Sequence, residues 1–142
     1  MRAWICLLLL ITGCSDRLVI YHQFVKADDV ASVRVNTPDP NPAEPGERLV
    51  MMWGLPPEYV DIEPKQLILW IRYHNGCEEE LCFDLCGLSG RCIWEVRGDL
   101  HKETRGIASY RAVLMAGCEL IEEWRHQVWV ERIQILDSPQ AP

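Results

Sequence analysis

LILWIRYHNG, residues 67–76, is the stretch that decides the fold. Its first seven positions hold leucine, isoleucine, tryptophan and tyrosine around a single arginine. Branched and aromatic side chains of this kind favour a β-strand. The stretch ends at Asn75-Gly76, a pair typical of the tight turn that joins two antiparallel strands. We therefore expect a strand over Leu67–His74 that turns back into a second strand.

Further strands are expected on both sides of this turn. Upstream, Leu49, Met51 and Trp53 share one parity before Pro56-Pro57 ends the run. The strands expected downstream are Leu81–Leu85, Cys92–Val96 after a turn at Gly87–Gly90, and Ile107–Ala116, with a polar connection over Gly98–Arg105. Short strands separated by turn signals every eight to twelve residues are typical of a β-sandwich or barrel.

The apolar residues 119–136 allow two interpretations. Their alternation changes parity between Val128 and Trp129, which predicts a strand with a β-bulge or kink near residues 128–130. A helix over Glu119–Arg132 competes, because several apolar residues of this segment also fit helical spacing. The β-branched and aromatic ending, WVERIQI, favours the strand.

Two of these strands carry a family resemblance. Leu49-x-Met51-x-Trp53-x-x-Pro56 resembles the second strand of fibronectin type III domains, and Tyr110-x-Ala112-x-Leu114-x-Ala116 resembles the sixth. Tyr73 stands where that family has an aromatic residue on its third strand. The resemblance implies an all-β, immunoglobulin-like (fibronectin type III-like) sandwich, which we place at residues 44–137, with 138–142 as a C-terminal tail. It also implies that the third strand pairs antiparallel with the sixth. The insertion around residues 77–92 departs from the family pattern.

The segment LLLLITGCSD, residues 7–16, is expected to be removed in part. The apolar run is too short to span a bilayer, which needs roughly 20 residues, and it ends in small residues as a cleavable signal does. Ile11-Thr12-Gly13-Cys14 resembles the lipobox of bacterial lipoproteins. The resemblance implies a signal peptide over residues 1–13 and acylation of Cys14. Ser15 in place of aspartate favours the outer over the inner membrane.

Residues 14–43 are expected to form a lipid-anchored N-terminal segment that ends in a proline-rich linker. NTPDPNPAEPGE, residues 36–47, has four prolines, which exclude both helix and strand interior. It is expected to be a stiff, extended linker or a strand-edge segment at the boundary of the main domain. Apolar residues between positions 17 and 35 fit either a strand of the sandwich or a tether, and the sequence leaves both open.

The charge balance limits the partners. The chain has 142 residues and a net charge of −7, which argues against nucleic acid and against electrostatic binding to anionic lipid. We therefore expect contact with the membrane through the lipid anchor, an unknown envelope protein as partner, and localisation in the cell envelope.

Seven cysteines suit an oxidising compartment. Cys6 is expected to leave with the signal peptide. Disulfides are expected among Cys77, Cys82, Cys86 and Cys92, with Cys86–Cys92 across the Gly87–Gly90 turn and Cys77–Cys82 as the favoured pairs. Metal binding and redox-active thiols remain alternatives, although the spacings fit zinc poorly. Cys118 is expected to stay unpaired, because it follows the sixth strand at the opposite end of the sheet from Cys77.

Other chemistry-bearing residues form no recognisable catalytic set. The histidines, His22, His74, His101 and His126, are scattered, and His126 is interpreted as packed or edge-exposed. Neither a Gly-x-Ser-x-Gly elbow nor a phosphate-binding loop is present. We therefore expect no enzyme, no metal and no cofactor. The expected function is a lipid-anchored protein that displays a β-sandwich for protein binding or envelope structure. The alternative is a thiol-redox or metal-binding envelope factor that uses the four clustered cysteines.

Overall fold

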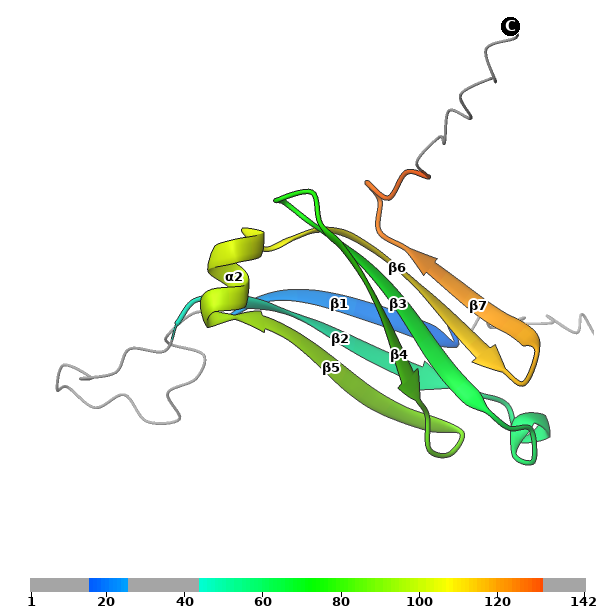
Figure 1. The fold of residues 1–142 in the computed structure, drawn as a ribbon. Coiled ribbons are helices and arrows are strands. Elements are labelled where there is room, and N and C mark those ends of the chain that lie inside the picture. Colours follow the sequence, from blue (N-terminus) through cyan, green and yellow to red (C-terminus); the bar gives the residue numbers. More distant parts are fainter. Residues whose placement is uncertain (1–15, 26–43, 132–142) are drawn as a thin grey trace, which may run out of the picture.

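The structure, a computed structural model, describes residues 16–25 and 44–131. Two antiparallel sheets pack against each other (Figure 1), with strand orders β1-β2-β5 and β4-β3-β6-β7. The elements are β1 (Leu18–Val25), β2 (Gly46–Gly54), the 3₁₀ turn η1 (Pro57–Tyr59), β3 (Lys65–Tyr73), β4 (Glu78–Asp84), β5 (Ser89–Arg97), α2 (Gly98–Thr104), β6 (Ile107–Ala116) and β7 (Glu119–Arg125). The predicted all-β sandwich is confirmed for this part of the chain.

The three-stranded sheet includes the N-terminal strand β1. It pairs with β2 along its whole length, from Leu18 opposite Trp53 to Val25 opposite Gly46. Leu18 and Ile20 are buried, because alternate side chains of a strand point to the same face. For Leu18–Val25 the question that the sequence left open is thereby answered, while residues 26–35 lie outside the described part. The sandwich begins before the boundary predicted at residue 44. In chain order the proline-rich segment follows β1, and its residues 36–43 lie outside the described part.

The four-stranded sheet is built around β3. Burial alternates at every position from Lys65 to Tyr73, so one face of β3 lies in the core and the other faces outward. β3 pairs antiparallel with β6, with Lys65 opposite Ala116. The predicted pairing of the third strand with the sixth is confirmed.

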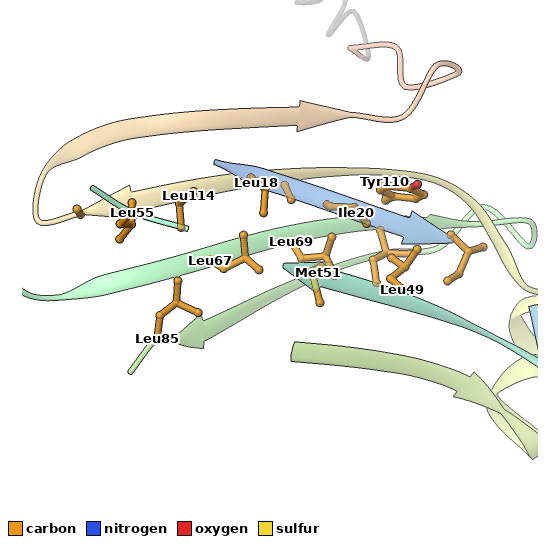
Figure 2. Close-up of a cluster of buried hydrophobic side chains, with 14 of the residues drawn as sticks. Leu18, Ile20, Leu49, Met51, Leu55, Leu67, Leu69, Leu85, Tyr110 and Leu114 are labelled. Atoms are coloured by element: carbon orange, nitrogen blue, oxygen red, sulfur yellow. The ribbon is translucent and has the colours of Figure 1, made fainter. Parts of the chain in front are cut away.

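The core lies between the two sheets. Figure 2 shows buried side chains from β1, β2, β3 and β6 meeting in this layer. Several are completely shielded from solvent, among them Leu49, Met51, Leu67 and Leu69. Each large apolar side chain buried in this way contributes roughly 1.5–3 kcal/mol.

Two expected connections differ from the structure. The polar connection over Gly98–Arg105 contains the helix α2, which ends where Arg105 adopts a left-handed conformation with φ 61°.

The last strand, expected over residues 119–136, is shorter in the structure. β7 ends at Arg125, and a turn follows in which the Trp129 N–H donates to the His126 carbonyl. The helical alternative is wrong for Glu119–Arg125. The register irregularity falls between Leu114 and Met115, opposite the first half of β7, and not near residues 128–130.

Strand pairing defines two ends of the sandwich. The Arg17 end contains the start of β1, the η1 loop, the β4–β5 loop and the β6–β7 turn, because Leu18 lies opposite Trp53, Gly54 opposite Ser89, and Lys65 opposite Ala116. The α2 end contains α2 and the end of β1, because Val25 and Arg97 both lie opposite Gly46. Figure 1 shows α2 and the β6–β7 turn at these opposite ends.

Candidate functional site

A buried carboxylate lies near the α2 end, between the sheets. Glu47 on β2 is 6% exposed. Its Oε2 lies 2.8 Å from His22 Nε2 on β1 and accepts the Ile107 backbone N–H of β6 at 2.9 Å. Its Oε1 lies 3.5 Å from His101 Nε2 on α2. One side chain therefore joins both sheets and the helix, and its charge is met by hydrogen bonds, as a buried charge requires.

Gly106 makes room for this carboxylate. A Cβ atom at Gly106 would lie 2.1 Å from Glu47 Oε1, and the residue has φ +87°, a conformation that side chains rarely adopt. The glycine is therefore required both by the backbone conformation and by the close approach of Glu47.

Aromatic and imidazole rings continue the cluster toward β7. His22 meets Tyr110 edge-on at 5.9 Å between ring centroids, and Tyr110 lies 4.8 Å from His126. Burial lowers the pKa of His126, and the nearby His22 lowers it further. Burial also raises the pKa of Tyr110. His126 Nδ1 is buried, and no hydrogen-bond partner for it occurs among the described residues.

Histidines that are scattered in the sequence thus come together in the fold. His22, His101 and His126 share one region, while His74 lies exposed beyond β3. The sequence carried one usable signal, since His22 has the same parity in β1 as the buried Leu18 and Ile20. Within the described ranges, no set of three His, Cys, Asp or Glu side chains is arranged to hold a metal ion. The observed contacts of the cluster join structural elements to one another.

The clustered cysteines lie in different environments. Cys77 precedes β4 at the α2 end, Cys82 lies on β4 opposite Ile68, Cys86 is in the β4–β5 loop, and Cys92 is on β5 opposite Met51. All four are free thiols in the structure, so the predicted Cys86–Cys92 and Cys77–Cys82 bridges are both absent among the described residues. Cys118 is also a free thiol. The predicted Cys77–Cys82 bridge is incompatible with β4, because five extended residues separate their Cα atoms by about 16 Å. A disulfide requires about 7 Å or less.

Cys92 and Cys118 differ in exposure. Cys92 is half-buried against the core, and burial raises the pKa of its thiol to about 11. A thiol with a raised pKa is a poor nucleophile, because the thiolate is the reactive form. Cys118 lies exposed beyond the end of β6, near the start of β3, where the predicted strand pairing placed it.

The outer face of the four-stranded sheet, here called the charged face, is covered by contacts among its own side chains. Arg72 Nε donates to Glu78 at 2.6 Å, and its guanidinium lies 3.9 Å from the Trp129 ring. Trp70 Nε1 donates to Glu80 at 2.8 Å, and Arg111 lies 4.9 Å from the Trp70 ring. These four charged groups, Arg72, Arg111, Glu78 and Glu80, therefore already have partners within the chain.

The outer face of the three-stranded sheet carries an apolar patch. The register places Val19 opposite Met52, and Tyr21 opposite Val50, which in turn lies opposite Ile93. These five residues define the apolar patch. Tyr21 is 52% exposed, Met52 46% and Ile93 41%. Large apolar groups that gather on one exposed face are typical of an interaction site.

Comparison with known proteins finds no matching family model, and no match among curated proteins or solved structures. A search of the described helices finds none of the length and apolar character needed to cross a bilayer. The predicted lipidation site, Cys14, lies outside the described residues.

Proposed function

We propose that this chain is a lipid-anchored envelope protein whose β-sandwich binds a partner protein through the apolar patch. The patch carries the proposal, because exposed Tyr21, Met52 and Ile93 are neighbours across three paired strands. Tyrosine and methionine are enriched at protein interfaces. The anchor is supported by the lipobox-like Ile11-Thr12-Gly13-Cys14 and by the apolar run before it.

A fibronectin type III-like identity for the sandwich is part of the proposal. Its support is the pairing of the third strand with the sixth, together with the positions of the two motif aromatics. Trp53 packs against the core near the end of β2, just before Pro56. Tyr110 is buried on β6.

Charged side chains at the edge of the apolar patch indicate what kind of protein surface would bind there. Arg91 on β5 lies opposite Met52. Arg48 on β2 lies two residues from Val50 on the same face, opposite Glu95, whose carboxylate is paired with Arg97 at 2.9 Å. Arg91 and Arg48 both stand out on a chain with net charge −7. Complementary charges guide encounter and exclude wrong partners. We therefore expect a protein surface with an apolar centre and carboxylates at its edge.

The placement of the cysteines argues against the alternative function of a thiol-redox or metal-binding factor. Cys77 and Cys82 are about 16 Å apart along β4, and Cys92 lies in the other sheet with a raised pKa. Thiol-redox chemistry requires two adjacent, reactive thiols. The separation of Cys77 from Cys82 and the location of Cys92 in the other sheet do not provide such a pair.

The binding proposal is tested by photocrosslinking in intact envelopes. A photoreactive residue at Met52 should give one discrete protein adduct, whereas the same residue at Arg125, whose side chain is 48% exposed on the charged face, should give none. Ile93→Asp should abolish the Met52 adduct while the circular dichroism spectrum stays unchanged. Equal adducts at both sites, or an adduct that survives Ile93→Asp, would contradict the proposed surface.

The anchor is tested separately by intact mass. Protein extracted from membranes should begin at Cys14 and exceed the peptide mass by two or three acyl groups. Cys14→Ala should release the protein from membranes. A mature chain that begins elsewhere and carries no lipid would overturn the anchor and leave the binding test unaffected.

A further inference from the structure

The position of β1 limits the distance between the sandwich and the proposed anchor. Four residue steps separate Cys14 from Leu18, the first residue of β1. A fully extended chain spans at most about 3.5 Å per residue, so Leu18 lies within about 14 Å of the acylated residue. The proline-rich segment follows β1 in the chain, so it does not lengthen this connection. The proposed anchor therefore leaves no long tether before the sandwich.

Chain length then selects which end of the sandwich faces the bilayer. The Arg17 end contains the start of β1. The α2 end lies at the other end of the same strand, about 23 Å away at roughly 3.3 Å for each of the seven steps from Leu18 to Val25. With so short a connection, the Arg17 end lies next to the lipid headgroups and the α2 end lies away from them.

The Arg17 end exposes apolar side chains in the elements that surround the start of β1. Val60, after η1, is 56% exposed, and Ile62 is 37% exposed. Ile62 lies close to the β6–β7 turn, since its Cγ2 would be 3.3 Å from a Cβ atom at Gly117. Leu120, just past this turn, is 53% exposed. Exposed apolar groups also occur at the α2 end, among them Leu100, so exposure alone would not choose between the ends.

We propose that the sandwich rests directly on the bilayer, with Val60, Ile62 and Leu120 in contact with the lipid headgroup region. This inference rests on the proposed lipid anchor at Cys14. The free energy falls when apolar side chains move from water into the boundary between headgroups and acyl chains. Three exposed side chains alone would bind a bilayer weakly. The lipid anchor holds the sandwich at the membrane surface and so raises its effective concentration there.

The charged side chains at the Arg17 end predict which lipid headgroups this end contacts more strongly. Three carboxylates, Glu58, Asp61 and Glu119, lie near Val60 and Ile62 and outnumber the nearby cation, Arg17. The carboxylate of Glu63 is paired with the buried Lys65 at 2.7 Å. Carboxylates are repelled by anionic headgroups. Contact should therefore be stronger on phosphatidylcholine vesicles than on vesicles rich in phosphatidylglycerol, and salt should reduce the difference by screening.

The experiment places a photoreactive residue at Ile62 or at Leu100 in the full lipidated chain, reconstituted in phosphatidylcholine vesicles. These two positions form a matched pair, since both are 37% exposed and apolar but lie at opposite ends. We expect lipid adducts at Ile62 at least fivefold more often than at Leu100. Equal yields at both sites would overturn the proposed orientation.

A longer connection sharpens the test. Twelve glycine and serine residues inserted between Asp16 and Arg17 add a flexible reach of about 20 Å, and they should lower the Ile62 adduct severalfold without removing the acyl groups from the intact mass. An acylated chain whose Ile62 yield is unaffected by the insertion would contradict the short-connection argument. A chain without acyl mass would instead overturn the proposed anchor, so the two failures are distinguishable.

Discussion

The two outer faces of the sandwich use their surface side chains in opposite ways. On the charged face, Arg72 and Arg111 each combine an ion pair with an aromatic ring, Trp129 and Trp70 respectively. On the outer face of the three-stranded sheet, Tyr21, Met52 and Ile93 remain exposed to solvent. Both faces are built from strands with the same period of two, so the difference lies in the side chains alone.

This difference indicates which face is available to another molecule. A partner that docks on the charged face would have to displace ion pairs and cation–π contacts that the chain already makes. A partner that docks on the apolar patch would remove exposed apolar area from water at no such cost. The comparison therefore predicts that substitutions on the charged face change stability, and that substitutions in the patch change binding.

A large loss of stability should come from replacing Glu47, the side chain that joins the two sheets. Glu47→Ala removes the acceptor for His22 and leaves the Ile107 backbone N–H buried without its partner. A lost charge-assisted hydrogen bond with an unsatisfied donor costs about 3 kcal/mol of unfolding free energy. Urea denaturation followed by circular dichroism measures this change.

Glu95→Ala provides the matched control for Glu47→Ala. Glu95 is in the same sheet, but its partner Arg97 and its own side chain are both substantially exposed. Exposed ion pairs contribute little, so this variant should stay within about 0.5 kcal/mol of the wild type. Similar losses for Glu47→Ala and Glu95→Ala would contradict the role assigned to the buried carboxylate.

A smaller effect is expected on the charged face. Trp70→Ala removes the hydrogen bond to Glu80 and the ring beside Arg111. Together these contacts are worth about 1–2 kcal/mol. Trp70→Phe keeps the ring and loses the hydrogen bond, so its unfolding free energy should fall between those of wild type and Trp70→Ala. If neither variant changes stability, the contacts on this face are not the stabilising network described above.

A third effect depends on pH and concerns the segment that covers the charged face. His126 begins the turn that places Trp129 over Arg72. Its pKa is lowered below the usual 6.5 by burial and by His22, so the folded state favours the neutral ring. Its contribution to stability is therefore full above pH 6.5 and is lost as the pH falls through the lowered pKa.

His126→Phe should reduce this loss, because phenylalanine keeps a ring beside Tyr110 and does not titrate. The comparison is the change in unfolding free energy between pH 7.5 and 5 for the wild type, for His126→Phe and for His74→Phe. His74 is exposed and serves as the control. An unchanged pH dependence in His126→Phe would assign the acid sensitivity to other groups.

The sequence predicted the fold well where its pattern is local. Alternation and turn residues located β3 and β6, and the resemblance supplied their pairing. The start of the domain and the Cys77–Cys82 pair were not predicted correctly, because both depend on which strands meet in space. β1 joins β2 across residues 26–43, and the extent of β4 separates the two cysteines.

The candidate sites were less accessible to sequence analysis. Glu47 is the last residue of the proline-rich segment 36–47, where an acidic residue is usually exposed, yet it belongs to β2. Only the fold brings His22, Ile107 and His101 to it from three other elements. The apolar patch likewise combines β1, β2 and β5 in a register that no single segment specifies.

The smallest effect on stability is expected within the patch, and two adjacent methionines make the test a matched one. Met51 is fully buried and Met52 is 46% exposed, because consecutive side chains of β2 point to opposite faces. Met51→Ser should cost about 2–4 kcal/mol, since it leaves a cavity and a buried hydroxyl. Met52→Ser should stay within about 0.5 kcal/mol of the wild type, measured by the same urea denaturation. A side chain that contributes so little to folding is free to contribute to binding, whereas a large loss for Met52→Ser would mean that the patch serves the fold.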